Sequence, residues 1–241
     1  MKKITTGKNV DKTSTSSNRK GVKMMALKVL GISGSPVKEG NTETYLQYML
    51  EIATRKGLSC ETVNLSEVDI SDCKHCNFCI RKQSSEKYCA IDDGAQSIFK
   101  KAEQADIIIL ASPVYFMRTS GRMAALIDRL RVFLYGNHTG GKLKNKIGVS
   151  AAVSWWRNGG LETTHLSHIQ AFITLGMIPT GARKGVSPLG ASAVASPNGS
   201  GKFDRNSRLG VRQDELGLQS AAATMERAIE LATLINRGKG C

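Results

Sequence analysis

Several familiar signatures are absent from this sequence. No apolar run approaches the roughly 18 residues that a membrane helix needs, and the polar N-terminus lacks the apolar core of a secretory signal. We therefore expect a cytoplasmic protein without membrane partners, whose cysteines are thiols or metal ligands rather than disulfides. The four histidines show no Ser–His–acid or metal-hydrolase spacing, so no catalytic side chain is assigned.

Aromatic residues are also scarce, at 5% of the chain, although the formal net charge is +14. Residues 1–23 carry seven Lys or Arg and one acid, are rich in Ser and Thr and have no apolar period. This composition predicts a disordered basic tail. The remaining positive charge is scattered, so nucleic-acid binding is not favoured. An anionic cofactor or an acidic electron-transfer partner explains it as well.

Apolar strand patterns alternate with amphipathic helix patterns along residues 24–241, which predicts one α/β domain. Right-handed crossovers then give a doubly wound parallel sheet of five strands, in the flavodoxin-like order 2-1-3-4-5. The expected strands are 28–33, 59–65, 106–111, 146–153 and 176–182. The expected helices are 41–56, 94–104, 119–133, 161–175 and 214–236.

The first loop, Val29 to Thr44, is a strand followed by a glycine- and hydroxyl-rich turn and a helix start. Such a junction gathers unpaired backbone N–H groups at the positive end of a helix dipole, which suits a phosphate. Ser33, Ser35, Asn41 and Thr42 could add side-chain hydrogen bonds. The alternative is an ordinary strand–helix turn capped by Asn or Thr. Neither a Walker loop nor a G-x-G-x-x-G fingerprint is matched.

Two later loops should meet the first at the carboxyl edge of the sheet. Ala111 to Gly121 reads A-S-P-V-Y-F-M-R-T-S-G, and Ser154 to Thr164 reads S-W-W-R-N-G-G-L-E-T-T. Apolar and aromatic side chains beside free backbone groups suit a flat heteroaromatic ligand. Ordinary core packing of Tyr115, Phe116 and one Trp is the alternative.

Four cysteines fall in the segment 71–92, in the pattern C-x2-C-x2-C-x9-C formed by Cys73, Cys76, Cys79 and Cys89. Three thiols spaced by three residues are typical of a [4Fe–4S] site. Zinc more often uses two separated C-x2-C pairs. We favour the cluster, with redox-active or unligated thiols and zinc as alternatives. Cys89 is the least secure ligand because its gap is long.

Residues 187–213 are rich in Gly, Ser and Pro and show no apolar period. A stretch of this length inside a compact domain indicates a flexible insertion, either a lid near the ligand or inert surface.

Three motifs together resemble the NADPH-dependent FMN reductase superfamily, and most closely its iron–sulfur flavoprotein branch: G-I-S-G-S-P-V-K-E-G-N-T, then S-P-V-Y-F with A-L-I-D-R, then R-N-G-G-L-E-T-T. The resemblance spans about residues 27–182 and implies FMN bound across the three loops. It departs from the family at Met117-Arg118, where relatives often carry Gly and a small residue. The implied phosphate-side residues are Ser33, Ser35, Pro36, Val37, Asn41, Thr42 and Glu43. The implied ring-side residues are Pro113, Val114, Tyr115, Phe116, Trp155, Arg157, Asn158, Gly159 and Gly160.

The resemblance further implies an FMN-dependent oxidoreductase that passes electrons between an external donor, a [4Fe–4S] cluster and FMN. NAD(P)H or ferredoxin is the expected donor, the acceptor is a small molecule or a protein, and the assembly is a homodimer or homotetramer. The alternatives are an NAD(P)H-dependent FMN or quinone reductase without a cluster and, in another class, a zinc-stabilised basic binding module.

Overall fold

The computed structural model describes residues 26–182, 187–204 and 208–238. The predicted tail 1–23 lies outside these residues. The elements, in chain order, are β1 (Lys28–Ser33), α1 (Asn41–Arg55), β2 (Ser59–Asn64), α2 (Phe78–Arg81), α3 (Ala95–Gln104), β3 (Ile107–Tyr115), β4 (Arg118–Thr119), α4 (Gly121–Arg129), α5 (Arg131–Leu134), β5 (Ile147–Ser154), α6 (Leu161–Thr174), β6 (Ile178–Thr180), β7 (Ala191–Val194), the 3-10 helices η1 (Pro197–Gly199) and η2 (Gly210–Gln213), and α7 (Glu215–Gly238).

The sheet runs in the order β2-β1-β3-β5-β6, and all the pairs along this path are parallel. Because β4 is only a short antiparallel return beside β3, this order is the predicted 2-1-3-4-5 with shifted numbers. The predicted flavodoxin-like fold class is therefore confirmed. The carboxyl ends of β1, β3 and β5 lie side by side at one edge of the sheet.

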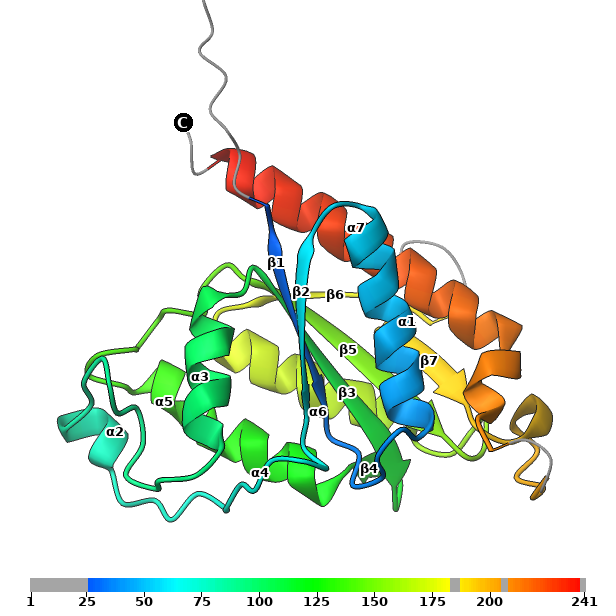
Figure 1. The fold of residues 1–241 in the computed structure, drawn as a ribbon, viewed down its shortest axis with the longest axis horizontal. Coiled ribbons are helices and arrows are strands. Elements are labelled where there is room, and N and C mark those ends of the chain that lie inside the picture. The colour runs from blue at the N-terminus through cyan, green and yellow to red at the C-terminus, as the bar shows by residue number, and fades with distance from the viewer. Residues whose placement is uncertain (1–25, 183–186, 205–207, 239–241) are drawn as a thin grey trace, which may run out of the picture.

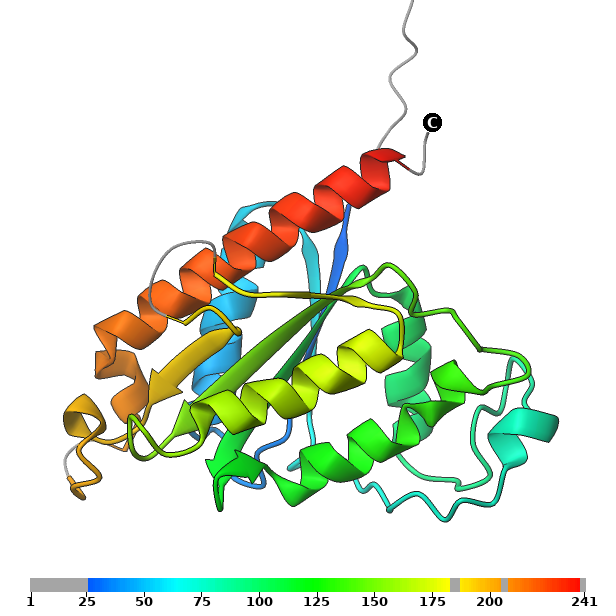
Figure 2. The ribbon, with the colours of Figure 1, turned by 180° about the vertical axis from the view of Figure 1, so that it is seen from behind.

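Both faces of the sheet are covered by helices (Figures 1 and 2). Successive residues of a strand point to opposite faces, so Val29 packs in a core with α1 and α7, while Leu30 packs in a second core with α3, α4, α5 and α6. β3 repeats this alternation, and this explains why its sequence is apolar at almost every position. β5 places Ile147, Val149, Ala151 and Val153 in the first core, and small or hydroxyl residues face the other side.

The structure differs from the sequence expectation at residues 187–213. Ala191–Val194 forms β7, which pairs in parallel with β5, and η1 and η2 follow. Ala191 and Ala193 are buried against α7. These side chains are small and no amphipathic helix precedes them closely, so the strand leaves little periodic signal.

The helix expected over residues 119–133 is also divided. It begins at Gly121 and ends at Arg129, and α5 follows after Leu130. Among the described residues, every helix is too short or too polar to cross a bilayer.

Candidate functional site

The first and second loops are joined directly at the carboxyl edge of the sheet. Gly34 donates its N–H to the carbonyl of Ala111 at 2.7 Å, and its own carbonyl accepts the Ser120 hydroxyl at 2.7 Å. A Cβ on Gly34 would lie 2.7 Å from the Cβ of Met123, so only glycine fits there. The same Ser120 hydroxyl accepts the N–H of Met123 and caps α4. Two of the three predicted loops are thus held in a fixed relation.

The first loop presents the start of α1 without a side-chain cap. Gly40 occupies the N-cap position, so the first N–H groups of this helix gain no side-chain acceptor from it. The Ser35 hydroxyl accepts the N–H of Val37 at 3.0 Å and keeps the turn tight. Ser33 and Thr42 are buried beside it. An uncapped helix start in a glycine-rich turn is a site for an anion.

Two residues predicted on the phosphate side are already engaged elsewhere. Asn41 accepts the N–H of Val211 at 3.0 Å and donates to the carbonyl of Arg208, which ties α1 to the segment around η2. Glu43 accepts the Glu39 N–H and the Ser66 hydroxyl. The side chains of Asn41 and Glu43 therefore stabilise the turn that precedes α1. Of the other predicted residues there, Pro36 and Val37 are exposed.

The second loop is a two-residue β-hairpin between β3 and β4. Val114 pairs with Thr119, and Tyr115 pairs with Arg118. The turn residues Phe116 and Met117 have φ values of 47° and 63°, as in a type I′ turn, which ordinarily favours Gly and Asn. Phe116 is 100% exposed. The first residue of the Met117-Arg118 departure therefore has a backbone conformation that glycine adopts more easily than methionine.

The third loop contacts the second through Gly160. This glycine has a φ of 99°, and a Cβ there would lie 2.5 Å from the Cα of Met117. Thr163 donates its hydroxyl to the Met117 carbonyl, which fixes the hairpin against α6. All three predicted loops therefore meet at one edge of the sheet.

The segment after β7 closes over the third loop. Trp155 donates its indole N–H to the carbonyl of Gly201 at 2.8 Å, and its ring lies 6.3 Å from that of Phe203. Arg157, predicted on the ring side, forms an ion pair with Asp214 at 3.6 Å. Arg157 and Asn158 line a cavity of about 400 Å³ with residues of α6 and β7. Of the two alternatives given for residues 187–213, a segment near the third loop agrees with the contacts of Gly201 and Phe203.

The four cysteines of the segment 71–92 line one pocket. Cys79 is buried, Cys73 and Cys89 are half-buried and Cys76 is exposed. No three His, Cys, Asp or Glu side chains are drawn together as a metal-binding group in the described ranges. The thiols are therefore neighbours around one space. Burial raises the pKa of the Cys79 thiol, and the charge of Arg131 opposes that rise.

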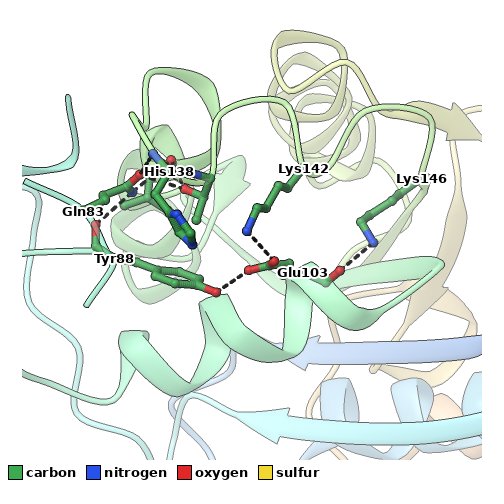
Figure 3. A network of polar contacts seen from close by, with 8 residues as sticks. Gln83, Tyr88, Glu103, His138, Lys142 and Lys146 are labelled. Carbon is green, nitrogen blue, oxygen red and sulfur yellow. Dashed lines mark hydrogen bonds and ion pairs between the residues drawn. The ribbon is translucent and has the colours of Figure 1, made fainter. Parts of the chain in front are cut away.

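Anchors on both sides hold the cysteine segment to the domain (Figure 3). Gln83 donates to the carbonyls of Tyr88 and Val132 and accepts the N–H of His138. The Tyr88 hydroxyl donates to Glu103, whose carboxylate also receives Lys142 at 2.7 Å. These hydrogen bonds therefore hold the backbone around Cys79 and Cys89 in place.

Arg129 is the most deeply buried charged side chain beside this pocket. It is 1% exposed and pairs with Asp93 at 2.5 Å. Burial alone would raise the pKa of Asp93, but Arg129 and the Ser71 N–H lower it. The Nε and Nη2 atoms of Arg129, and the Nε of Arg131, have no hydrogen-bond partner. Both arginines line the cysteine pocket. Such orphaned donors are costly and call for an acceptor.

His165 and His168 form a second buried polar cluster with Ser150. The Ser150 hydroxyl lies 2.7 Å from Nδ1 of His165 and 2.8 Å from Nδ1 of His168. The outer nitrogens contact Ser192 at 2.7 Å and Thr119 at 3.0 Å. Burial lowers the pKa of His165 to about 4, and burial together with His165 lowers that of His168 to about 3. Both rings are therefore neutral near pH 7, and all four ring nitrogens are engaged.

A cavity of about 640 Å³ lies along α1 and reaches the end of the first loop. Its lining includes Glu39 and Glu43 of that loop, together with Glu51 and Arg212. Of these residues, Glu43 alone was predicted from the sequence as a site residue.

A parallel doubly wound sheet with three loops meeting at the carboxyl edge defines a flavodoxin-like protein. The profile of the NADPH-dependent FMN reductase family matches residues 27–187. An iron–sulfur flavoprotein of Methanocaldococcus jannaschii is 34% identical over 88% of this chain and 100% of its own length. Another, from Methanosarcina thermophila, is 37% identical over 62% of this chain and 78% of its own.

Among solved structures, RosB with bound 8-demethyl-8-formylriboflavin-5′-phosphate superposes with a TM-score of 0.62 at 16% identity, covering 88% of this chain and 81% of its own. This likeness supports the fold. The chain belongs to the NADPH-dependent FMN reductase family, in its iron–sulfur flavoprotein branch, and is an FMN-dependent oxidoreductase.

Proposed function

We propose that this protein exchanges electrons between an external donor, a [4Fe–4S] cluster held by Cys73, Cys76, Cys79 and Cys89, and FMN held at the three loops. Ferredoxin or NAD(P)H is the proposed donor, and a small molecule or a protein the acceptor. The observation that carries the proposal is that four thiols and two arginines line one pocket, and that three nitrogens of these arginines have no hydrogen-bond partner.

The cysteine pocket suits a four-thiolate metal centre, and the spacing of the cysteines favours a cluster over zinc. Thiolates are soft ligands, and three of them at a spacing of three residues suit a cubane. A four-thiolate cluster is anionic and bears sulfur acceptors, and the pocket offers buried arginine donors that lack acceptors. A bare pocket of neutral thiols leaves those donors unsatisfied.

The three loops suit FMN through their own groups. The start of α1 and the buried Ser33 and Ser35 offer N–H and hydroxyl donors to a phosphate. The exposed side chains of Tyr115, Phe116 and Trp155 offer apolar surface to a ring system. FMN, when bound, supplies the redox chemistry, and the protein supplies binding, orientation and tuning. Thr42 and Pro113 belong to the same proposed site.

Anaerobic purification with measurement of iron, sulfide, zinc and flavin tests the proposal. We expect FMN, equal amounts of iron and sulfide, and broad visible absorbance beyond the flavin bands. Cys76→Ser should lose the iron and the broad absorbance but keep FMN. Cys60→Ala is the matched control, because Cys60 lies on β2, outside the pocket.

Two results would contradict parts of this proposal. Bound FMN without iron or sulfide would exclude the cluster and support an NAD(P)H-dependent FMN or quinone reductase. Stoichiometric zinc without flavin would favour a zinc-stabilised binding module. Sedimentation of the native protein tests the homodimer or homotetramer that we also propose.

A further inference from the structure

The Arg129 guanidinium is held in place, but only one of its three nitrogen atoms donates hydrogen bonds. Its Nη1 donates to Asp93 at 2.5 Å and to the Ser71 carbonyl at 3.2 Å. Asp93 is itself held by the N–H groups of Ser71 and Ala95. The guanidinium is therefore locked in position while its Nε and Nη2 remain without acceptors. These two buried nitrogens can donate hydrogen bonds to a group that occupies the adjoining pocket.

Arg131 approaches the same pocket from the start of α5. Its Nη2 donates to the side chain of Asn77 at 3.1 Å, and its guanidinium lies 5.6 Å from the ring centre of Tyr135. Its Nε is buried and unpaired. Both guanidinium groups line the same pocket as the four cysteine side chains.

The charges at this pocket do not cancel. Asp93 neutralises Arg129, and among the described residues no acid forms an ion pair with Arg131. A cluster with four thiolates is negative, and each electron that it accepts makes it more negative. Nearby positive charge and hydrogen bonds to sulfur stabilise the reduced form more than the oxidised form.

We propose that Arg129 and Arg131 donate hydrogen bonds to the sulfur atoms of the cluster and raise its reduction potential. This inference rests on the proposed [4Fe–4S] occupancy. The arginines act through the cluster and are tuning residues. Their function is to bring the potential of the cluster upward, toward that of a flavin.

The test is a potentiometric titration of anaerobic, cluster-loaded protein, followed by electron paramagnetic resonance. Arg131→Gln should shift the ratio of oxidised to reduced cluster at a fixed potential at least tenfold toward the oxidised form, which is 59 mV for one electron. Iron and sulfide contents should not change. Arg81→Gln is the control, because Arg81 is an exposed arginine of α2 outside the pocket.

Arg129 needs a second design, because its loss would leave Asp93 unpaired. Arg129→Lys keeps a charge but removes the Nε and Nη2 donors. A lowered potential in this variant assigns part of the effect to hydrogen bonds. If Arg129→Lys fails to fold, the double variant Arg129→Gln/Asp93→Asn removes both partners, and it should also lower the potential.

Unchanged cluster potentials in Arg131→Gln and in the Arg129 variants, at full iron content, overturn the inference and leave the proposed function intact. Wild-type protein without iron and sulfide overturns both. The potential of FMN in the same samples is an internal reference, since a shift common to both centres would indicate a general structural change.

Discussion

The two buried polar clusters of the α3–α6 layer differ in whether their hydrogen bonds are complete. Around Ser150, both nitrogens of His165 and of His168 have partners within the protein. Around Arg129, three buried nitrogens of two arginines have none. A closed network stabilises the fold by itself, whereas an open one leaves donors that a ligand or a bound water would satisfy. The comparison separates a structural cluster from a binding pocket without reference to conservation.

The largest effect is expected from breaking the ion pair of the open cluster. Asp93→Ala leaves Arg129 buried without a carboxylate, and removal of one partner from a buried pair costs about 3–5 kcal/mol. Urea unfolding of the cluster-free protein measures this. Asp92→Ala, at the exposed neighbour, is the control and should change the free energy of unfolding little. Equal effects of the two substitutions would contradict the buried pairing.

The closed cluster should make stability depend on pH. The pKa values of His165 and His168 are lowered to about 4 and about 3, whereas an unfolded histidine titrates near 6.5. As pH falls below about 6.5, these two histidines therefore bind protons in the unfolded state but stay neutral in the folded state. Stability is full above that pH and falls by roughly 1.4 kcal/mol per pH unit for each histidine until the folded pKa is reached.

Unfolding free energies measured from about pH 7 to about pH 4, where an unfolded histidine becomes protonated but the buried His168 does not, test the pH effect. The double variant His165→Gln/His168→Gln should show a flatter profile. His75→Gln, at an exposed histidine, should keep the wild-type slope. A wild-type profile as flat as that of the double variant would mean that the two rings are not buried as neutral groups.

Removal of the shared hydroxyl should open the closed cluster. Ser150→Ala leaves Nδ1 of both histidines without its partner, at a cost of about 1–3 kcal/mol for each buried group left unsatisfied. Thermal unfolding at neutral pH measures it. Ser97→Ala, on the exposed side of α3, is the matched control. A cost no greater than that of the control would show that the network is not closed through Ser150.

The smallest effect is expected in the open cluster. Arg131→Gln removes one hydrogen bond, to the Asn77 side chain, but also an Nε that has no partner, so the cluster-free protein should lose only about 1 kcal/mol of stability. The same urea experiment measures it. A loss similar to that of Asp93→Ala would mean that Arg131 is a structural residue, and the contrast between the clusters would disappear.

The sequence was sufficient for the order of the sheet because β1, β3 and β5 are buried on both faces and therefore read as apolar runs. It was not sufficient for β7, whose Ala191 and Ala193 bury too little surface to show a period. The split of the helix around Leu130 was also missed, since the apolar pattern continues across it.

The candidate site was predicted to a similar degree. The meeting of the three loops follows from the topology, and the cysteine pocket follows from spacing. The contacts of Asn41 with Val211 and of Arg157 with Asp214 could not be predicted, because these partners lie more than 50 residues away in the chain. Arg129 closes the A-L-I-D-R motif, but the motif does not relate it to the cysteines. Only the packed structure brings it to Asp93 and the thiols.

The hydrogen bonds of Gln83 and Tyr88 bear on how a metal centre would form. Because these side chains hold the cysteine segment through contacts with α5 and α3, its backbone is ordered by the protein itself. In zinc-finger peptides metal binding and folding are one event. A cluster bound by these thiols would instead enter a segment that is already folded, with little change in heat capacity.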